Sequence, residues 1–310
     1  MPTASMSVAQ FLTVGDLDVD VLIAVDQLPT QDGKVNGRLI QRVPGGMAAN
    51  VAVAIAQLGG IVAIAGRVGE DAEASFVLDQ LKARGVDTRH VKPLPGANTF
   101  SCISLIAADG EKSLIKLMTD AYCPTAEDLT PDIFLGVTHA HLTSARDPDL
   151  CRRVVALAKA AGASCSLDVE SADLPRIAAD ALAALQGFDI LLFNRASRKA
   201  AATLLGTNLP TLAPVIITTM GLDGAAATCP DGQHHAPGFQ VPVSDTTGAG
   251  DCFAGALLHA RIAQQRDWPD ALRFANAAAA LSVQGLGAQT ALPSLDAVEA
   301  LLARHGKPLL

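Results

Sequence analysis

The sequence predicts an α/β protein in which a mostly parallel β-sheet lies between helices. From Asp147 onward, short apolar stretches of strand character alternate with helical stretches, and this order is typical of parallel sheets. Several of the expected strands end on a polar side chain or a glycine, at the edge where open parallel sheets bind ligands. Half of the 310 residues are hydrophobic and only 4% are aromatic, so we expect a large core of small aliphatic side chains.

In the N-terminal half, apolar runs bounded by glycine and polar turns indicate the strands. Asp109-Gly110 lies between two such runs and is a strong hairpin signal. A helix opens at Pro44-Gly45-Gly46 and reaches Leu58, and Asp71 is placed to cap the next one. We expect strands at 11–15, 38–43, 61–65, 99–107, 112–118 and 137–143, and helices at 44–58 and 72–84.

The C-terminal half repeats strand and helix and then becomes helical. Asp168 and Asn194 fall at the carboxyl ends of successive expected strands, so we expect them at one edge of the sheet. His234-His235 lies between turn residues, where a surface position is expected. We expect strands at 164–168, 189–193 and 215–219, and helices at 150–161, 174–185, 253–263 and 271–283.

Residues 244–251, with the sequence SDTTGAGD, open directly into an alanine-rich helix. Gly248 and Gly250 lack a Cβ, so the backbone can bend sharply and approach a ligand closely. The first N–H groups of the helix are unpaired and lie at the positive end of its dipole, which favours a bound phosphate. Asp251 lies in the same turn and can take a proton from a substrate hydroxyl, so the stretch predicts phosphoryl transfer. Gly-x-Gly-Asp alone could also be a turn whose Asp caps a helix.

Asp16, Asp18 and Asp20 follow the first expected strand and alternate with apolar residues. In extended backbone this alternation places the three carboxylates on one face. The face could be a ligand site or a solvated strand surface.

These motifs resemble the two signatures of the ribokinase-like, or phosphofructokinase B, carbohydrate kinases. Residues 244–251 resemble the second signature, and Pro44-Gly45-Gly46-Met47-Ala48-Ala49-Asn50 resembles the first. The similarity extends from about Phe11 to Arg304. It implies a ribokinase-like three-layer sandwich in a single domain, 1–310, with a small β lid formed by about 17–43 and 99–118.

The resemblance also implies the roles of the reacting groups. Asp251 would be the general base, and the N–H groups of Gly248, Ala249 and Gly250 would hold the charge of the transition state. The acceptor would be oriented by residues of the first signature and by the acid five positions after Gly15, namely by Asp20, Gly45, Gly46 and Asn50.

On the nucleotide side, the resemblance implies a phosphate grip at the turn after the strand 215–219 and an adenine contact at the helix 271–283. Asn194 would lie at the neighbouring strand end. The loop 284–291 resembles one whose carbonyls, with Asp245 and Thr247, hold a monovalent cation. The cofactor-binding residues are therefore expected to be Asn194, Thr219, Gly221, Gly224 and Asn276.

The sequence departs from its relatives at three places. Many relatives carry a Glu three positions after the Asn that Asn194 matches, and that Glu organises the Mg²⁺ shell; here Ser197 stands there, so no Mg²⁺ ligand is assigned. Ribokinase has Lys where this chain has Met47, and a sugar-binding Glu at the strand end where this chain has Thr143-Ser144-Ala145-Arg146. Arg146 could meet an anionic substituent of the sugar, or be a solvated side chain at a helix start.

Charge and composition exclude several classes of function. The net charge is −8 and no block of Lys or Arg is present, which argues against a nucleic-acid surface. The six cysteines show no zinc or disulfide spacing, so reduced thiols are expected. His139 and His141 have no third ligand nearby in the sequence for a metal site. No secretion signal or apolar run of about 18 residues is found, so we expect a cytoplasmic protein without a membrane span.

Together these features predict an ATP-dependent kinase that phosphorylates a hydroxyl of a sugar or sugar acid. ATP and Mg²⁺ are the expected cofactors, K⁺ is a further candidate, and the resemblance implies a homodimer. A nucleoside kinase of the same fold is one alternative, disfavoured because a single Trp and a single Tyr offer few rings to stack on a base. The other alternative is a non-catalytic sugar or nucleotide sensor. The loops of P-loop enzymes, protein kinases and dinucleotide oxidoreductases are not found.

Overall fold

A nine-stranded sheet forms the centre of the computed structural model, which describes residues 10–176, 184–206 and 209–306. The strand order is β13-β12-β11-β10-β9-β8-β1-β4-β5. All neighbours from β11 to β5 pair in parallel, and β12 and β13 add an antiparallel edge. The strands are β1 (Gln10–Val14), β4 (Ile61–Val68), β5 (Asp87–Pro93), β8 (His139–Leu142), β9 (Ser164–Val169), β10 (Ile190–Asn194), β11 (Val215–Thr219), β12 (Ala225–Cys229) and β13 (Gly232–Ala236).

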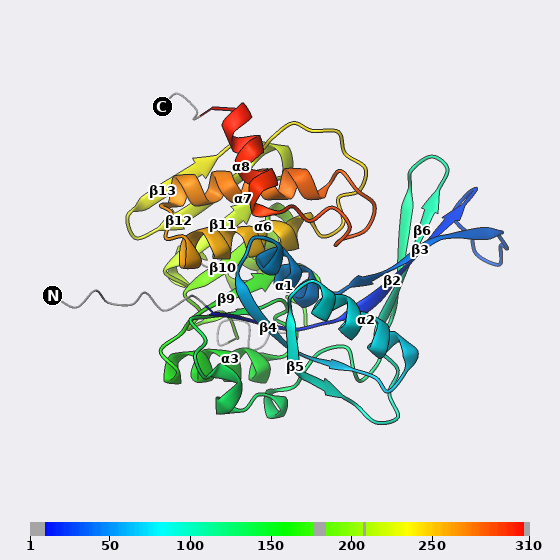
Figure 1. The fold of residues 1–310 in the computed structure, drawn as a ribbon, viewed down its shortest axis with the longest axis horizontal. Helices are drawn as coiled ribbons and strands as arrows, with labels where there is room; N and C mark the ends of the chain where they lie inside the picture. Colours follow the sequence, from blue (N-terminus) through cyan, green and yellow to red (C-terminus); the bar gives the residue numbers. More distant parts are fainter. Residues whose placement is uncertain (1–9, 177–183, 207–208, 307–310) are drawn as a thin grey trace.

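Helices cover both faces of this sheet (Figure 1). One core lies under α1, α2, α6, α7 and α8, and the other under α3 and α5. Within β1, Phe11 belongs to the first core and Leu12 to the second, which is why parallel strands are apolar on both faces. The three-layer α/β architecture expected from the sequence is confirmed. The helices are α1 (Met47–Gln57), α2 (Ala72–Ala83), α3 (Pro148–Ala160), α5 (Arg195–Leu205), α6 (Ala249–Leu258), α7 (Trp268–Ser282) and α8 (Leu295–Arg304).

No helix in the described part of the chain has both the length and the apolar character needed to span a membrane. A π-helical turn at His259–Ala263 continues α6. Short 3-10 turns lie at Ala126–Asp128, Pro131–Phe134, Leu209–Thr211 and Gly221–Asp223.

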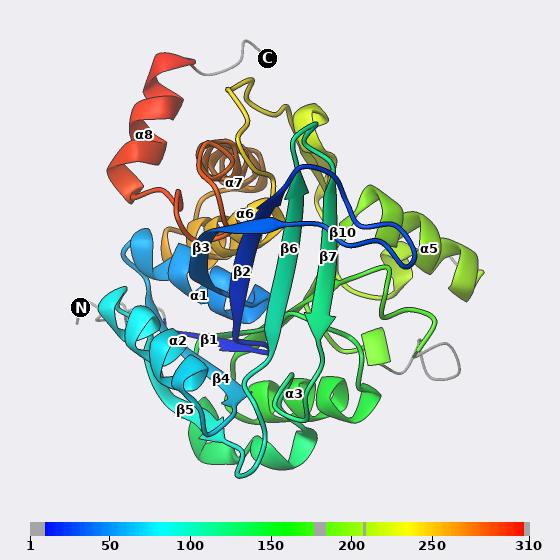
Figure 2. The same ribbon diagram turned by 90° about the vertical axis from the view of Figure 1, so that its right-hand side faces the viewer.

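A second sheet of four strands stands beside the body as a lid, with the order β3-β2-β6-β7 (Figure 2). Its strands are β2 (Asp18–Val25), β3 (Gly37–Gly45), β6 (Ser101–Ala107) and β7 (Lys112–Leu117). The register pairs Asp20 with Cys102 and Cys102 with Lys116. Because side chains alternate along a strand, these three residues share one face, which we call the inner face. Ile103 and Ile115, which are also paired, lie on the opposite, outer face.

Three strands were not expected from the sequence. β5 is a polar edge strand, and β13 carries few residues with strand preference. β12 is mostly alanine, so its apolar run has little strand preference either. His234 and His235 lie in β13 rather than between turn residues, and His235 is exposed as expected, whereas His234 is partly buried. The expected helix 174–185 falls largely on 177–183, outside the described residues.

The His139 and His141 side chains of β8 are buried in a network with serines of β9. His139 lies 2.7 Å from the hydroxyls of both Ser164 and Ser166, and Nδ1 of His141 lies 2.7 Å from Ser166 Oγ. Burial lowers the pKa of both imidazoles to about 3, so both are neutral near pH 7. The serines satisfy both ring nitrogens of His139 and Nδ1 of His141.

We predict that His141 makes the protein less stable as the pH falls. The pKa of His141 in the folded protein lies well below the ordinary value of 6.5. Between pH 6.5 and 3, His141 is therefore protonated in the unfolded chain but stays neutral in the folded protein. The stabilisation present above pH 6.5 is lost across this window, by at most about 1.4 kcal/mol per pH unit. His141→Asn should reduce the slope of the unfolding free energy against pH by about this amount, measured by urea unfolding between pH 7 and 4. An identical slope in both proteins would contradict the prediction.

Candidate active site

The N-terminus of α6 forms a glycine turn that is open on one side. Gly248 caps the helix with φ 75°, and a Cβ there would lie 2.6 Å from the Cβ of Ala288, so only glycine fits. A Cβ on Gly250 would meet no atom within 4 Å apart from its own helix and chain neighbours, so that side faces open space. The N–H of Ala249 donates to Thr246 O (3.2 Å), whereas those of Gly248 and Gly250 have no partner in the described part of the chain. Gly248 and Gly250 are therefore the better placed of the three predicted anion donors.

Asp251 is held in place by a chain of two side-chain amides. Asn50 of α1 donates from Nδ2 to Asp251 Oδ2 (2.7 Å), and Gln289 donates from Nε2 to Asn50 Oδ1 (2.9 Å). Asn50 was expected to bind acceptor hydroxyls, which stays a prediction, and its amide also holds the expected base. Gln289 was not singled out from the sequence, although it lies in the loop 284–291.

Other carboxylates surround Asp251. Burial raises its pKa well above the ordinary value, the charges of Asp168, Asp16 and Glu170 raise it further, and the bond from Asn50 opposes the rise. Burial and the charge of Glu170 raise the pKa of Asp168 to about 7. Asp251 is therefore a strong proton acceptor. A cation bound nearby would reduce the repulsion between these carboxylates. Glu170 carries no sequence motif and was not predicted.

On the expected acceptor side, Asp18 and Asp20 project from the inner face of the lid strand β2. A Cβ on Gly45 would collide with both carboxylates, so glycine is needed there for the close approach of these side chains. Burial, with the charges of Asp16 and Asp245, raises the pKa of Asp20 to about 6. Asp16 lies before β2 rather than in it, so the three acids expected on one face of extended backbone do not share a strand. Asp16 and Asp18 are buried, which contradicts the alternative of a solvated strand surface.

Gly46 and Asp16 hold the start of α1 against the segment that follows β1. Gly46 is the N-cap of α1, and a Cβ there would lie 2.5 Å from the backbone oxygen of Asp16. The Asp16 carboxylate accepts bonds from Ala48 N and Thr143 Oγ1, each of 3.4 Å. Gly45 and Gly46 thus pack against the three acids Asp16, Asp18 and Asp20. The expected close approach of these glycines to a sugar stays a prediction.

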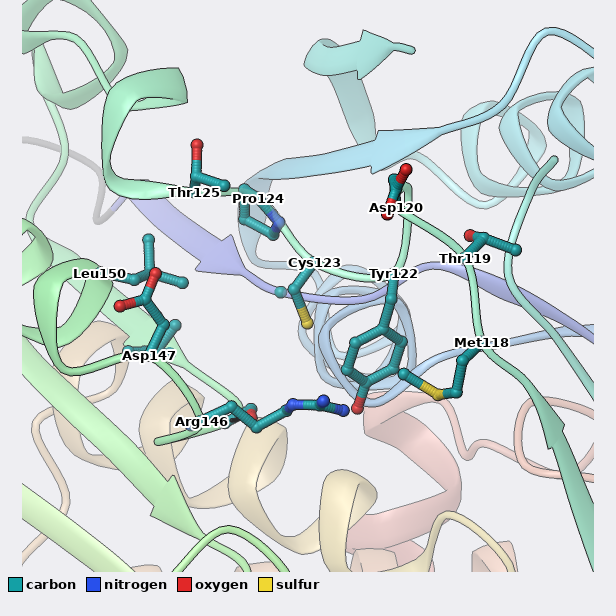
Figure 3. Close-up of a pocket in the computed structure, with 13 residues that line it drawn as sticks. Met118, Thr119, Asp120, Tyr122, Cys123, Pro124, Thr125, Arg146, Asp147 and Leu150 are labelled. Atoms are coloured by element: carbon teal, nitrogen blue, oxygen red, sulfur yellow. Dashed lines mark hydrogen bonds between the residues drawn. The ribbon is translucent and has the colours of Figure 1, made fainter. Parts of the chain in front are cut away.

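Arg146 borders a cavity of about 250 Å³ (Figure 3). Its guanidinium carbon lies 4.8 Å from the centre of the Tyr122 ring, and Phe100 packs edge-on against that ring at 4.5 Å. Asp173 accepts bonds from Ser144 Oγ (2.8 Å) and from the N–H of Ala145 (3.1 Å), which fixes the turn before Arg146. The cavity is lined by Gly15, Met118, Thr119, Asp120, Tyr122, Cys123, Pro124, Thr125, Leu142, Ser144, Arg146, Asp147 and Leu150.

The Arg146 guanidinium has no carboxylate within salt-bridge distance in the described part of the chain. It is therefore available to an anionic group that enters this cavity.

The expected nucleotide side lies at the ends of β10 and β11, where Asn194 and Thr219 are register partners. The Asn194 side chain caps α5 by accepting a bond from Ser197 N (2.9 Å). Gly221 and Gly224 have positive φ in the turn after β11. The Asn276 amide donates to Ala236 O (2.9 Å) and Pro237 O (3.1 Å), so it holds the end of β13. Contacts of these residues with a nucleotide stay predictions.

Asp245 and Thr247 lie together, since Thr247 Oγ1 donates to Asp245 Oδ1 (2.7 Å). The same oxygen accepts a bond from Lys112 Nζ of the lid (2.7 Å). A monovalent cation at Asp245 stays a prediction.

Comparison with known proteins decides the family. The sequence profile described as pfkB family carbohydrate kinase matches residues 9–295, which is most of the chain. This protein belongs to the pfkB family of carbohydrate kinases. Its reaction is therefore phosphoryl transfer to a hydroxyl group of a carbohydrate, as the sequence predicted.

Relatives of this pfkB kinase cover nearly its whole length. It is 33% identical to the ATP-dependent ribose-1-phosphate kinase of Halopiger xanaduensis, over 95% of this chain and 98% of that protein. It is 29% identical to the ribokinase of Bacillus subtilis, over 94% and 98%. Among solved structures, a putative ribokinase II from E. coli in its apo form matches with a TM-score of 0.82 at 26% identity, covering 96% of this chain and 100% of that one.

We predict that Asp251→Asn lowers kcat by about three orders of magnitude or more, since the amide cannot accept the proton of the acceptor hydroxyl. Nucleotide binding, measured by calorimetry, should stay within about threefold, since Asn is isosteric with Asp. Asp296→Asn is the matched control, because Asp296 lies in the first turn of α8 and is exposed. Turnover that survives Asp251→Asn would show that another group is the base.

Proposed function

We propose that this kinase transfers the γ-phosphoryl group of ATP to a hydroxyl of a sugar that carries an anionic substituent, such as a sugar phosphate or a sugar acid. The observation that carries this proposal is the Arg146 guanidinium, which faces the cavity without a carboxylate partner in the described part of the chain. A planar guanidinium is suited to phosphate and carboxylate groups. The relative named as a ribose-1-phosphate kinase supports a phosphorylated acceptor.

In this proposal the chain's own residues carry out the proton transfer and the positioning. Asp251, oriented by Asn50, accepts the proton of the acceptor hydroxyl. The N–H groups of Gly248 and Gly250 stabilise the charge on the transferring phosphoryl group at the N-terminus of α6. Asp20, with Gly45 and Gly46, would hold the remaining hydroxyls of the acceptor. Closure of the lid excludes water, which would otherwise be phosphorylated.

Mg²⁺ fits the carboxylates next to Asp251. Asp168 and Glu170 are oxygen donors of the kind that Mg²⁺ prefers. Burial raises the pKa of both, with the charge of Glu170 adding to the rise at Asp168 and the charges of Asp173 and Asp16 adding to it at Glu170. These two residues would hold the ion in place of the Glu that is missing three positions after Asn194. When bound with ATP, Mg²⁺ neutralises phosphate charge as phosphoryl transfer proceeds. A putative ribokinase II from E. coli, 25% identical, is described in complex with ATP and Mg²⁺.

ATP would bind at the ends of β10 and β11, with its phosphates at Gly221 and Gly224 and at the turn that begins α6. Thr219 and Asn194 border this region at the strand ends. Asn276 would act through the segment 236–237 that it holds. A fructokinase from Xylella fastidiosa with bound ATP matches the fold with a TM-score of 0.80 at 26% identity.

We predict a preference for anionic acceptors that depends on Arg146. ADP release should be measured with ribose, ribose phosphates, fructose, fructose phosphates, 2-keto-3-deoxygluconate and adenosine. Arg146→Met should lower kcat/KM for the preferred anionic acceptor by about 10–100-fold, the size of a lost charged hydrogen bond. The same change should alter kcat/KM for the neutral parent sugar by less than about threefold.

Arg89→Met removes an exposed arginine of the edge strand β5 and serves as the matched control. Equal losses for the neutral and the anionic acceptor would contradict the role of Arg146. Preference for adenosine would favour the nucleoside kinase alternative, and nucleotide binding without turnover of any acceptor would favour the sensor.

We further propose that two copies of the protein pair through the outer face of the lid. Leu39, Ile115 and Leu117 are 59%, 46% and 46% exposed, and an apolar sheet face of this kind is unfavourable in water. A second copy offers the same flat apolar surface, which suits a two-fold interface. The outer face also carries, by the strand registers, Ile23, Ile103 and Leu105.

We predict that Ile115→Glu converts a homodimer into monomers, because it places charges in the centre of the apolar interface. Size-exclusion chromatography with light scattering measures the mass. Leu135→Glu is the matched control, since Leu135 is 76% exposed and lies on the body rather than on the lid. A monomeric wild-type protein, or a dimer that survives Ile115→Glu, would contradict this interface.

A further inference from the structure

The Asp245 carboxylate is surrounded by hydrogen-bond donors and is only 4% exposed. Oδ1 accepts bonds from Lys112 Nζ (2.7 Å), Thr247 Oγ1 (2.7 Å) and Thr247 N (3.1 Å), and Oδ2 accepts one from Gly287 N (2.9 Å). Burial by itself would raise the pKa of Asp245, but these bonds lower it to about 2. The carboxylate is therefore held in its charged form.

Two side chains of the lid reach the loops around Asp245. Lys112 opens β7 and brings an ammonium group to Asp245, and Gln41 of β3 donates from Nε2 to Leu286 O (3.0 Å). The oxygens that accept these bonds belong to the loops 244–248 and 284–291. The resemblance described above assigns the cage of a monovalent cation to these same loops.

A monovalent cation and the Lys112 ammonium would compete for the same site. Two positive charges in contact with Asp245 Oδ1 repel each other, and Leu286 O is already hydrogen-bonded to Gln41. In this arrangement of the lid, the donors at Asp245 therefore do not fit a resident K⁺.

The loop 284–291 connects Asp245 with the glycine turn at the start of α6 and with Asp251. Gly287 N is bonded to Asp245, and the next residue, Ala288, packs against Gly248 so closely that no Cβ would fit there. Gln289, one position further on, bonds Asn50 and so orients Asp251. The net charge at Asp245 therefore influences the position of the loop 284–291, and through it both the glycine turn at the start of α6 and Asp251.

We propose that the Lys112 ammonium takes the place of a monovalent cation at Asp245, so that this kinase needs no K⁺ when its lid is closed. The inference rests on the proposed kinase function and gives Lys112 the role of a positioning residue. A lysine ammonium is a compact point charge, comparable in this respect to a bound K⁺. Because Lys112 belongs to the lid, closing the lid over the acceptor also completes the phosphate turn.

Steady-state kinetics in choline chloride and in KCl, at equal ionic strength, test this proposal. The wild-type kcat should be the same in both salts. Lys112→Met should lower kcat by about tenfold in choline chloride, through loss of the charge that positions the turn, and KCl should restore it. Lys112→Arg keeps the charge and should stay independent of K⁺. Glu111→Gln, an exposed neighbour in the same hairpin, controls for disturbance of the hairpin and should behave as wild type.

Thermal unfolding gives a second readout that needs no turnover. K⁺ should raise the Tm of Lys112→Met, because binding to the folded state stabilises it, and should leave the wild-type Tm unchanged. A wild-type protein that K⁺ activates or stabilises, or a Lys112→Met variant with normal kcat in choline chloride, would overturn the proposal. If the wild type turns over no acceptor in either salt, the kinase proposal fails on its own, and the Tm values still decide whether Lys112 replaces K⁺.

Discussion

The close packing of α1 against α6 is the constraint on which the site depends. A Cβ on Gly255 would lie 2.8 Å from Ala54 Cβ and 2.9 Å from Val51 O, so the two helices approach as near as backbone atoms allow. This approach brings Asn50 of α1 within 2.7 Å of Asp251 of α6. A larger residue in place of Gly255 would move the helices apart and separate Asp251 from the Asn50 amide that holds it.

The charges of the site are arranged between the body and the lid. The body supplies buried carboxylates around Asp251. Their charges raise the pKa of Asp251 and favour a cation beside it. The inner face of the lid supplies lysines. Lys112 neutralises Asp245, and the charge of Lys116 opposes part of the rise in pKa that burial causes at Asp16 and Glu170. An open lid would withdraw both positive charges, so its position changes the electrostatics of the site as well as its access to water.

Particular residues show how far the sequence could predict this site. The expectation of a base at Asp251 and of an anion turn at Gly248 rested on chain-local features, namely glycines, a helix start and an acid in its first turn. The partners of Asp251 could not be found in that way. Gln289 is 239 positions from Asn50, and Glu170 carries no motif. β12 was missed because its alanines pack well in a strand only when the helix α7 covers them.

By itself the sequence determined the α/β class, the order of most strands and helices, the two glycine signatures and the family. The class and the order of the elements follow from the periodicity of apolar residues. The glycine signatures are short stretches that can be read locally, and their resemblance to known motifs indicated the family. Only the tertiary structure decided that Asn50 bonds Asp251, that Asp16 lies outside the strand, and that Lys112 reaches Asp245. These contacts join residues that are far apart in the chain, and their distances are set by how helices, sheet and lid pack together, which no local pattern encodes.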